Sequence, residues 1–185
     1  MRKLSVPTGK DWENVRQWRL SCPEALRPPY PLTKYEQEEH YLDVVASREA
    51  KAHTRWWMYG PDCALGLENL SSVNRRAEIS LIVNPKKRGK GLGTLAFKAL
   101  LHEAWYTLGL HSVYGEVYYC GALGFWQSVV PSVGGTGVRI PHTKWWDGQW
   151  FDSWLFTILC PLYTWVPLQR RMGADRCDPH FDANV

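Results

Sequence analysis

The stretch AEISLIVNPKKRGKGLGTLAFKALL, from Ala77 to Leu101, predicts three consecutive elements of structure. Residues 77–83 are almost wholly apolar beyond Glu78, as expected for a central β-strand that is buried on both faces. Asn84 and Pro85 end this strand, and a basic glycine-rich loop follows. Apolar side chains then recur at helical spacing, so residues 91–108 are expected to form a helix that ends at Gly109.

The loop Arg88-Gly89-Lys90-Gly91-Leu92-Gly93 has the features of an anion-binding site. Its three glycines let backbone amides point at one place without Cβ clashes, and the helix that follows adds its positive N-terminal end. Residues 75–90 hold six cations and one acid, a net of +5, whereas the whole chain carries +4. The loop therefore predicts binding of a small polyphosphate through main-chain N–H groups.

Two common glycine-rich motifs do not fit this loop. A Walker loop needs Gly-Lys-Ser/Thr at a fixed spacing, and a Rossmann fingerprint needs an acid at the end of a second strand. The alternative to a phosphate site is a basic turn that merely precedes an amphipathic helix.

The rest of the chain predicts further strands and helices around this core. Asp11 is expected to cap a first helix, and Thr33 opens a second with the capping box Thr33-Lys34-Tyr35-Glu36. A glycine turn is expected at residues 134–137, and Gly148 in a hairpin. Strands are expected at residues 2–6, 53–59, 64–70, 112–119, 139–145 and 150–160, and a short helix at 122–130. This order predicts an α/β fold with a mixed sheet, in a domain of residues 1–160 with a tail of residues 161–185 that is extended or partly disordered.

Composition excludes several classes of protein. The five cysteines are scattered without metal-binding spacing and the histidines form no cluster, so no metal is expected and the thiols indicate a cytoplasmic protein. No apolar run approaches the roughly 20 residues that span a membrane. Because the basic cluster is assigned to the loop, the rest of the chain has a net charge near zero. This disfavours nucleic acid as a binding partner without excluding it. Edge strands and an aromatic C-terminal region are compatible with a homodimer.

The loop and its surroundings resemble the GNAT superfamily of N-acetyltransferases. Arg88, Gly91 and Gly93 stand at the matching positions of the GNAT pyrophosphate motif, Arg/Gln-x-x-Gly-x-Gly/Ala. The likeness extends over about residues 4–159 and is nearest to the branch that acetylates ribosomal-protein N-termini and amino sugars. It implies a mixed, mostly antiparallel sheet flanked by helices, splayed between the strands at 77–83 and 112–119. Acetyl-CoA, or another short acyl-CoA, would bind there through residues of the strand, loop and helix: Leu81, Ile82, Val83, Arg88, Gly89, Lys90, Gly91, Leu92, Gly93 and Thr94.

Acetyl transfer to an amine requires the amine to be neutral and the leaving thiolate to be protonated. Glu78 is the first candidate for the general base, because the histone-acetylating branch has a glutamate in this Ala-Glu-Ile pattern; Glu116 is the second. Ion pairing of Glu78 with nearby arginines is the alternative. The Asn and Tyr that many members use after the fifth strand are missing, and Cys120 stands near the Asn position. Tyr119 is therefore the candidate proton donor, with Tyr118 or water as alternatives, and packing is the competing role for both tyrosines.

The acceptor is left open by the sequence. A small-molecule, amino-sugar or peptide amine is the first reading. A modified nucleobase or nucleic acid is the second, and a non-catalytic acyl-CoA-binding module is the third, since it would account for the missing Asn and Tyr.

Overall fold

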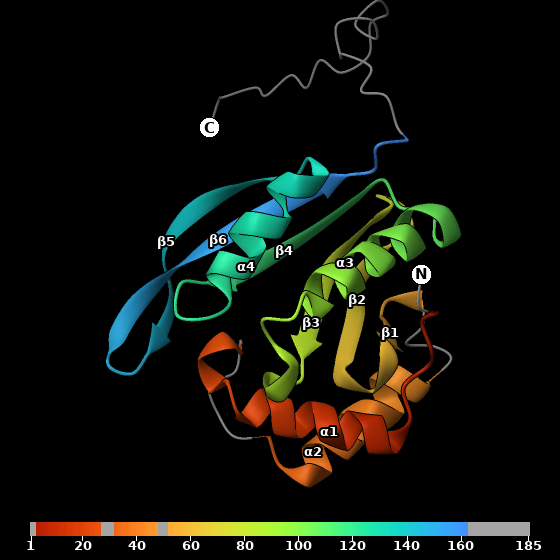
Figure 1. The fold of residues 1–185 in the computed structure, drawn as a ribbon, viewed down its shortest axis with the longest axis vertical. Coiled ribbons are helices and arrows are strands. Elements are labelled where there is room, and N and C mark those ends of the chain that lie inside the picture. The colour runs from red at the N-terminus through yellow and green to blue at the C-terminus, as the bar shows by residue number, and fades with distance from the viewer. Residues whose placement is uncertain (1–2, 27–31, 48–51, 163–185) are drawn as a thin grey trace, which may run out of the picture.

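The computed structural model describes residues 3–26, 32–47 and 52–162 (Figure 1). The predicted tail therefore lies outside the described residues beyond Leu162. The described strands form one six-stranded sheet in the order β1-β2-β3-β4-β6-β5, with every neighbouring pair antiparallel except β3 and β4. Their bounds are Arg55–Met58 (β1), Cys63–Ser71 (β2), Arg76–Val83 (β3), Ser112–Tyr118 (β4), Thr136–Trp146 (β5) and Gln149–Leu159 (β6).

Helices cover both faces of this sheet. The α-helices are Gly9–Leu20 (α1), Lys34–His40 (α2), Leu92–His102 (α3) and Leu123–Val129 (α4). π-helical turns extend α2 over Tyr41–Ala46 and α3 over Glu103–Thr107, so the long helix expected after the glycine loop is present in two parts. The mixed, mostly antiparallel α/β fold predicted from the sequence is confirmed.

The two faces of the sheet have separate cores. Ala64 and Ile82 pack with Trp12, Val15 and other side chains of α1 on one face. The neighbouring residues of β2 and β3 point to the opposite face of the sheet, where they pack with α3 and α4. The large core on that face includes Leu65, Leu67, Ile79, Phe97, Leu100, Trp126, Phe156 and Ile158. Alternation along β2 and β3 therefore buries both faces, as the apolar run in the sequence predicted.

Helix starts follow local capping chemistry. The capping box predicted at Thr33 is confirmed: its hydroxyl accepts from Glu36 N, and the Glu36 carboxylate accepts from Thr33 N at 2.8 Å. The prediction for α1 was wrong in one respect, because Thr8 is the N-cap and Asp11 is the third helical residue of the same kind of box. The Asp11 side chain bonds back to Thr8 N, so the helix begins two residues earlier than Asp11.

Two predictions about strands also need correction. Of residues 3–6, only Ser5 pairs with the sheet, through a single bridge to Met58, so no strand forms there. The glycine turn expected at 134–137 is shorter, because only Gly134 is left-handed there and β5 already begins at Thr136. Gly137 belongs to that strand, where a Cβ would lie 2.4 Å from the Trp154 ring. Gly148 forms the hairpin turn between β5 and β6 as predicted.

The splay predicted between the two central strands is confirmed. β3 and β4 pair in parallel at only three positions, the last of which joins Glu78 to Tyr114. Beyond that point β3 runs on to Val83 and β4 to Tyr118 without pairing to one another, and Figure 1 shows the two strands diverging. The sheet therefore has a V-shaped opening whose closed end is at Glu78.

Candidate active site

The glycine-rich loop lies at the open end of the V, between β3 and α3. Gly89 and Gly91 have φ angles of 73° and 74°, and a Cβ at either would meet nothing within 4 Å. These positions therefore need glycine for backbone conformation, and the surface above them is open. Gly91 is the N-cap of α3, and no side chain of the described residues caps it, so the first-turn amides of Leu92, Gly93 and Thr94 are available to an anion.

Gly93 is required for packing. It lies within α3, and a Cβ there would stand 3.2 Å from the ring of Phe125. The glycine therefore lets the start of α3 lie close to α4, which borders the other side of the V.

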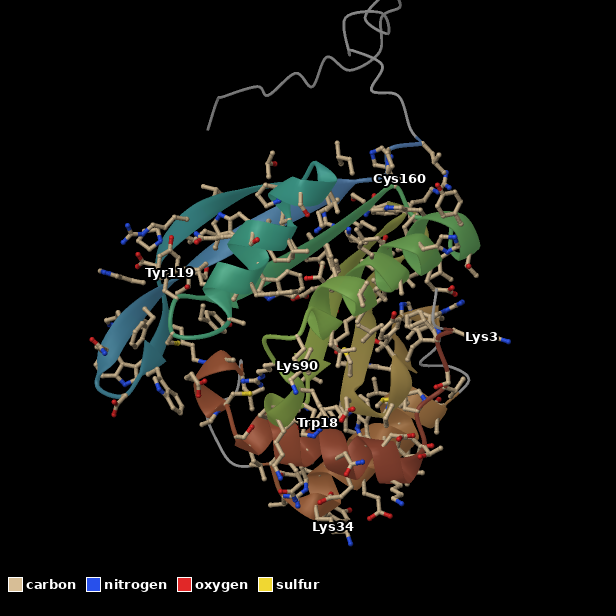
Figure 2. The ribbon with its side chains drawn as sticks, viewed as in Figure 1. Lys3, Trp18, Lys34, Lys90, Tyr119 and Cys160 are labelled. Atoms are coloured by element: carbon tan, nitrogen blue, oxygen red, sulfur yellow. The ribbon has the colours of Figure 1, made fainter. Side chains whose placement is uncertain are left out.

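The two cations of the loop are placed differently. Arg88 folds back, with Nε 3.3 Å from the carbonyl oxygen of Val83 and Nη2 3.4 Å from the sulfur of Cys22. Lys90 is exposed, and Figure 2 shows it above α1 in this view. A bound anion would therefore find one cation already anchored at the strand end and another free to swing toward it.

Backbone groups of β3 face into the V. Asn84 N donates to Asp62 O at 2.9 Å, which sets the register against β2. Because the direction of the peptide groups alternates along a strand, the backbone N–H and C=O of Ile82 point to β2. Those of Leu81 and Val83 point to the unpaired side, into the V. The strand thus offers Leu81 and Val83 to a ligand in the V, whereas Ile82 contributes its side chain to the α1 core.

Glu78 lies at the closed end of the V. Its side chain is 7% exposed and accepts a hydrogen bond from Asn69 Nδ2 at 2.9 Å. Asn69 sits where the β2–β3 register shifts and has a φ of 50°, so the irregularity of β2 turns its amide toward the carboxylate. Glu78 shares the sheet face of Ser80 and Ile82, which is the α1 face. Glu116 is half-buried on β4, two residues beyond Tyr114, and shares this face.

Tyr119 is placed away from Glu78. It follows β4 five residues after Tyr114, the partner of Glu78, which corresponds to about 16 Å along an extended chain. Its ring is 37% exposed, and the guanidinium carbon of Arg139 on β5 lies 5.5 Å from the ring centroid. Figure 2 shows Tyr119 on the β5–β6 side of the molecule, apart from Lys90.

The chain segment after α1 crosses the open end of the V, which the sequence did not indicate. Residues 22–26, here called the bridging segment, contain the 3-10 turn η1 (Pro23–Ala25). Cys22 contacts Arg88, as described above, and the carbonyl of Glu24 accepts from Cys120 Sγ at 3.3 Å and from Lys144 Nζ at 2.6 Å. Burial raises the pKa of the Cys120 thiol, which disfavours a nucleophilic thiolate there.

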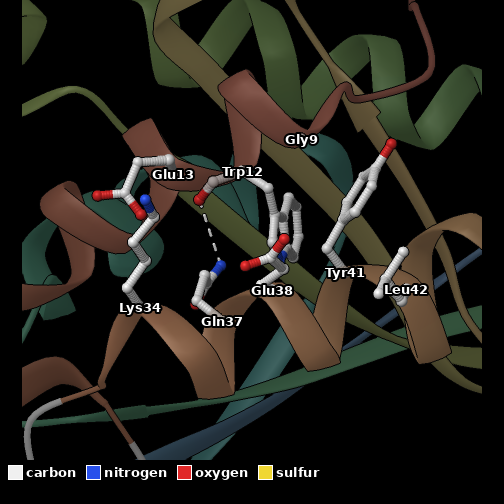
Figure 3. Close-up of a pocket in the computed structure, with 8 residues that line it drawn as sticks. All are labelled: Gly9, Trp12, Glu13, Lys34, Gln37, Glu38, Tyr41 and Leu42. Carbon is white, nitrogen blue, oxygen red and sulfur yellow. Dashed lines mark hydrogen bonds between the residues drawn. The ribbon is translucent and has the colours of Figure 1, made fainter.

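A separate groove of about 260 Å³ lies between α1 and α2 (Figure 3). Gln37 Nε2 donates to Trp12 O across its floor at 3.3 Å. None of the predicted site residues lines this groove: its walls are Gly9, Trp12, Glu13, Lys34, Gln37, Glu38, Tyr41 and Leu42. Over the described ranges, His, Cys, Asp and Glu side chains do not gather in threes as metal ligands, and no helix there is long and apolar enough to span a membrane.

Comparison with solved structures supports the same fold. Spermidine N-acetyltransferase SpeG from Vibrio cholerae, in complex with CoA and spermine, superposes with a TM-score of 0.73 at 17% identity, over 85% of this chain and 94% of that chain. A dodecameric structure of the enzyme from the same organism gives 0.69 at 18% identity, over 85% and 92%. No curated protein matches the sequence.

The sequence itself identifies the family. Residues 3–118 match the acetyltransferase (GNAT) domain, a span that includes α1, the first four strands and the glycine-rich loop. This span covers more than half of the chain and ends at the last residue of β4. The chain therefore belongs to the GNAT acetyltransferase family.

Proposed function

We propose that this protein transfers an acetyl group from acetyl-CoA, the donor used by its family, to a primary amine by direct attack in a ternary complex. The observation that carries the proposal is the V between β3 and β4, with an open glycine loop at one end and a buried carboxylate at the other.

The residues around the V suit an acyl-CoA. Amides of Gly89 to Thr94, with Arg88 and Lys90, would hold the pyrophosphate at the α3 N-terminus. Leu81 and Val83 would pair with the amide-bearing arm as an added strand would. The five residues from Val83 back to Glu78 span about 16 Å, so an extended arm reaches the closed end of the V. The bound donor supplies the activated thioester carbonyl.

Glu78 is the proposed general base. A free alkyl amine has a pKa near ~10, so only about one molecule in a thousand is neutral at pH 7. A carboxylate at the closed end of the V can take a proton from the ammonium, so that the neutral amine then attacks the thioester carbonyl, and positioned bases contribute about 10²–10⁴-fold. The hydrogen bond from Asn69 Nδ2 holds one carboxylate oxygen in place at the closed end of the V.

Tyr119 is the proposed proton donor to the leaving thiolate. The ring lies against Arg139, and Tyr119 follows the strand partner of Glu78 by five residues, so this role requires the segment after β4 to carry the hydroxyl toward the thioester when the cofactor binds. Tyr119→Phe is then expected to lower kcat by about tenfold or more, with acetyl-CoA affinity unchanged, in a thiol-release assay. Wild-type turnover by this variant would assign the ring to packing alone.

The proposed acceptor is a primary amine. Side chains of both signs line the α1 face near Glu78: Glu68 lies opposite it on β2, and the Arg19 guanidinium lies near Glu68. This mixture favours neither a polycation nor a strongly acidic substrate. The sequence resemblance suggests peptide N-termini and amino sugars as acceptors, and the similar structures suggest polyamines.

We further propose a cytoplasmic enzyme, with which the four free cysteines of the described residues agree. We also propose a homodimer formed through edge strand β5.

The test is a thermal shift with acetyl-CoA, followed by thiol release against a panel of amines. The panel contains spermine, a peptide with a free N-terminus, an amino-sugar nucleotide and an aminomethyl nucleoside. We expect acetyl-CoA at 100 times its Kd to stabilise the protein by about 2.7 kcal/mol, and one class of amine to be turned over. Stabilisation without turnover of any amine would favour a binding module, and no stabilisation would refute the proposed cofactor site.

A further inference from the structure

The bridging segment joins three parts of the chain that border the V. At Cys22 it meets Arg88, the first residue of the cofactor loop. At Ala25 it lies against Gly121, where a Cβ would come within 3.3 Å of the Ala25 methyl carbon. At Glu24 and Leu26 it is bound by Lys144 of β5. The segment therefore spans from the end of β3 to the far side of β4.

Lys144 holds this segment from β5 through its side-chain ammonium group. Its side chain is 5% exposed, although it carries an ammonium group. The Nζ atom donates to the carbonyl oxygens of both Glu24 and Leu26, and it lies 4.5 Å from the ring centroid of Tyr118 and 5.4 Å from that of Trp146. Two carbonyls and two aromatic faces thus replace the water that a surface lysine would keep.

This arrangement lies on the same face of the sheet as the proposed reaction centre. Tyr118, which Lys144 covers, is on the same face of β4 as Glu116 and Tyr114, which lie two and four residues before it along the strand. That face is continuous with Glu78, because Glu78 and Tyr114 are paired across the sheet. A segment fastened over Tyr118 therefore covers the part of this face that lies toward the open end of the V.

We propose that Lys144 is a positioning residue for the acceptor: it fixes the bridging segment across the open end of the V, and the segment forms one wall of the acceptor site. This inference rests on the proposed function. Burial lowers the pKa of the Lys144 ammonium, because the ion has lost most of its contact with water. An apolar replacement would remove the donor from the Leu26 carbonyl, leave the Glu24 carbonyl with the Cys120 thiol alone, and release the segment.

The test compares Lys144→Met, Lys144→Arg and the control Lys98→Met, whose lysine is exposed on α3. Hydrogen exchange at Ala25 and Leu26 is the first readout, because their amides are bonded within η1 at 3.1 Å. In Lys144→Met these amides are expected to exchange about tenfold faster or more, while the amides of α3 are unchanged. Lys144→Arg keeps a cation with several donors and is expected to recover most of the protection.

Kinetics provides the second readout, using spermine or whichever amine of the panel is turned over. Lys144→Met is expected to raise KM for the amine by about tenfold and to leave the acetyl-CoA Kd from calorimetry within about twofold. Unchanged exchange and unchanged amine KM would overturn the role of Lys144. Faster exchange with unchanged amine KM would overturn the acceptor wall. Acetyl-CoA binding without turnover of any amine would count against the proposed function, and the exchange data would still decide whether Lys144 holds the segment.

Discussion

Gly91→Glu is expected to weaken acetyl-CoA binding by about 100-fold or more in calorimetry. The new carboxylate would stand at the N-cap of α3, on a surface where the glycine Cα faces open space. Two unit charges 4 Å apart repel by about 4 kcal/mol at the effective dielectric near a protein surface, and tenfold in affinity corresponds to about 1.4 kcal/mol. Charge repulsion alone therefore accounts for the loss.

Backbone strain must be separated from this charge effect, and the chain offers a matched control. Gly148, in the β5–β6 turn, has a φ of 75° and equally open surroundings. Gly148→Glu introduces the same charge and the same left-handed strain of about 1–2 kcal/mol far from the loop. It is expected to lower the melting temperature as Gly91→Glu does while binding acetyl-CoA normally. Equal affinity in both variants would place the phosphate site elsewhere.

Glu78→Gln is expected to lower kcat by about 100-fold near neutral pH, with the acetyl-CoA Kd unchanged. The amide is isosteric and can still accept the hydrogen bond from Asn69, so the fold should tolerate it. Without a base, the rate depends on amine that is already neutral. The deficit should therefore be greatest at low pH and narrow as the pH approaches ~10, the usual pKa of an alkyl amine.

Glu116→Gln serves as the comparison for this variant. Glu116 is the second acid on the same sheet face, so it tests whether the effect belongs to one carboxylate or to the charge of the surface. A loss of turnover in Glu116→Gln alone would transfer the role of base to Glu116. A Glu78→Gln pH–rate profile that matches wild type would remove Glu78 from the mechanism.

Local sequence patterns predicted much of the framework because near neighbours decide it. The left-handed glycines at 89 and 91, the start of α2 at Thr33 and the turn at Gly148 depend on φ preferences and on hydrogen bonds within a few residues. The apolar run of β3 likewise predicted a strand buried on both faces. The errors lay where local alternatives compete: Thr8 and Asp11 both cap helices, and residues 3–6 were too short a pattern to specify pairing.

Only the tertiary structure decided which distant side chains meet. The sequence named Glu78 by its family pattern, but its place at the closed end of the V follows from where β4 stops pairing with β3. Tyr119 was chosen for its position after β4, and its contact with Arg139 depends on the β5–β6 hairpin. Lys144 carried no signal, because its partners lie 120 and 118 residues away. The sequence by itself determined the strand, loop and helix that suit acetyl-CoA, since backbone conformation and helical period are local properties. The walls of the proposed acceptor site depend on packing between elements far apart in the chain, which no local pattern encodes.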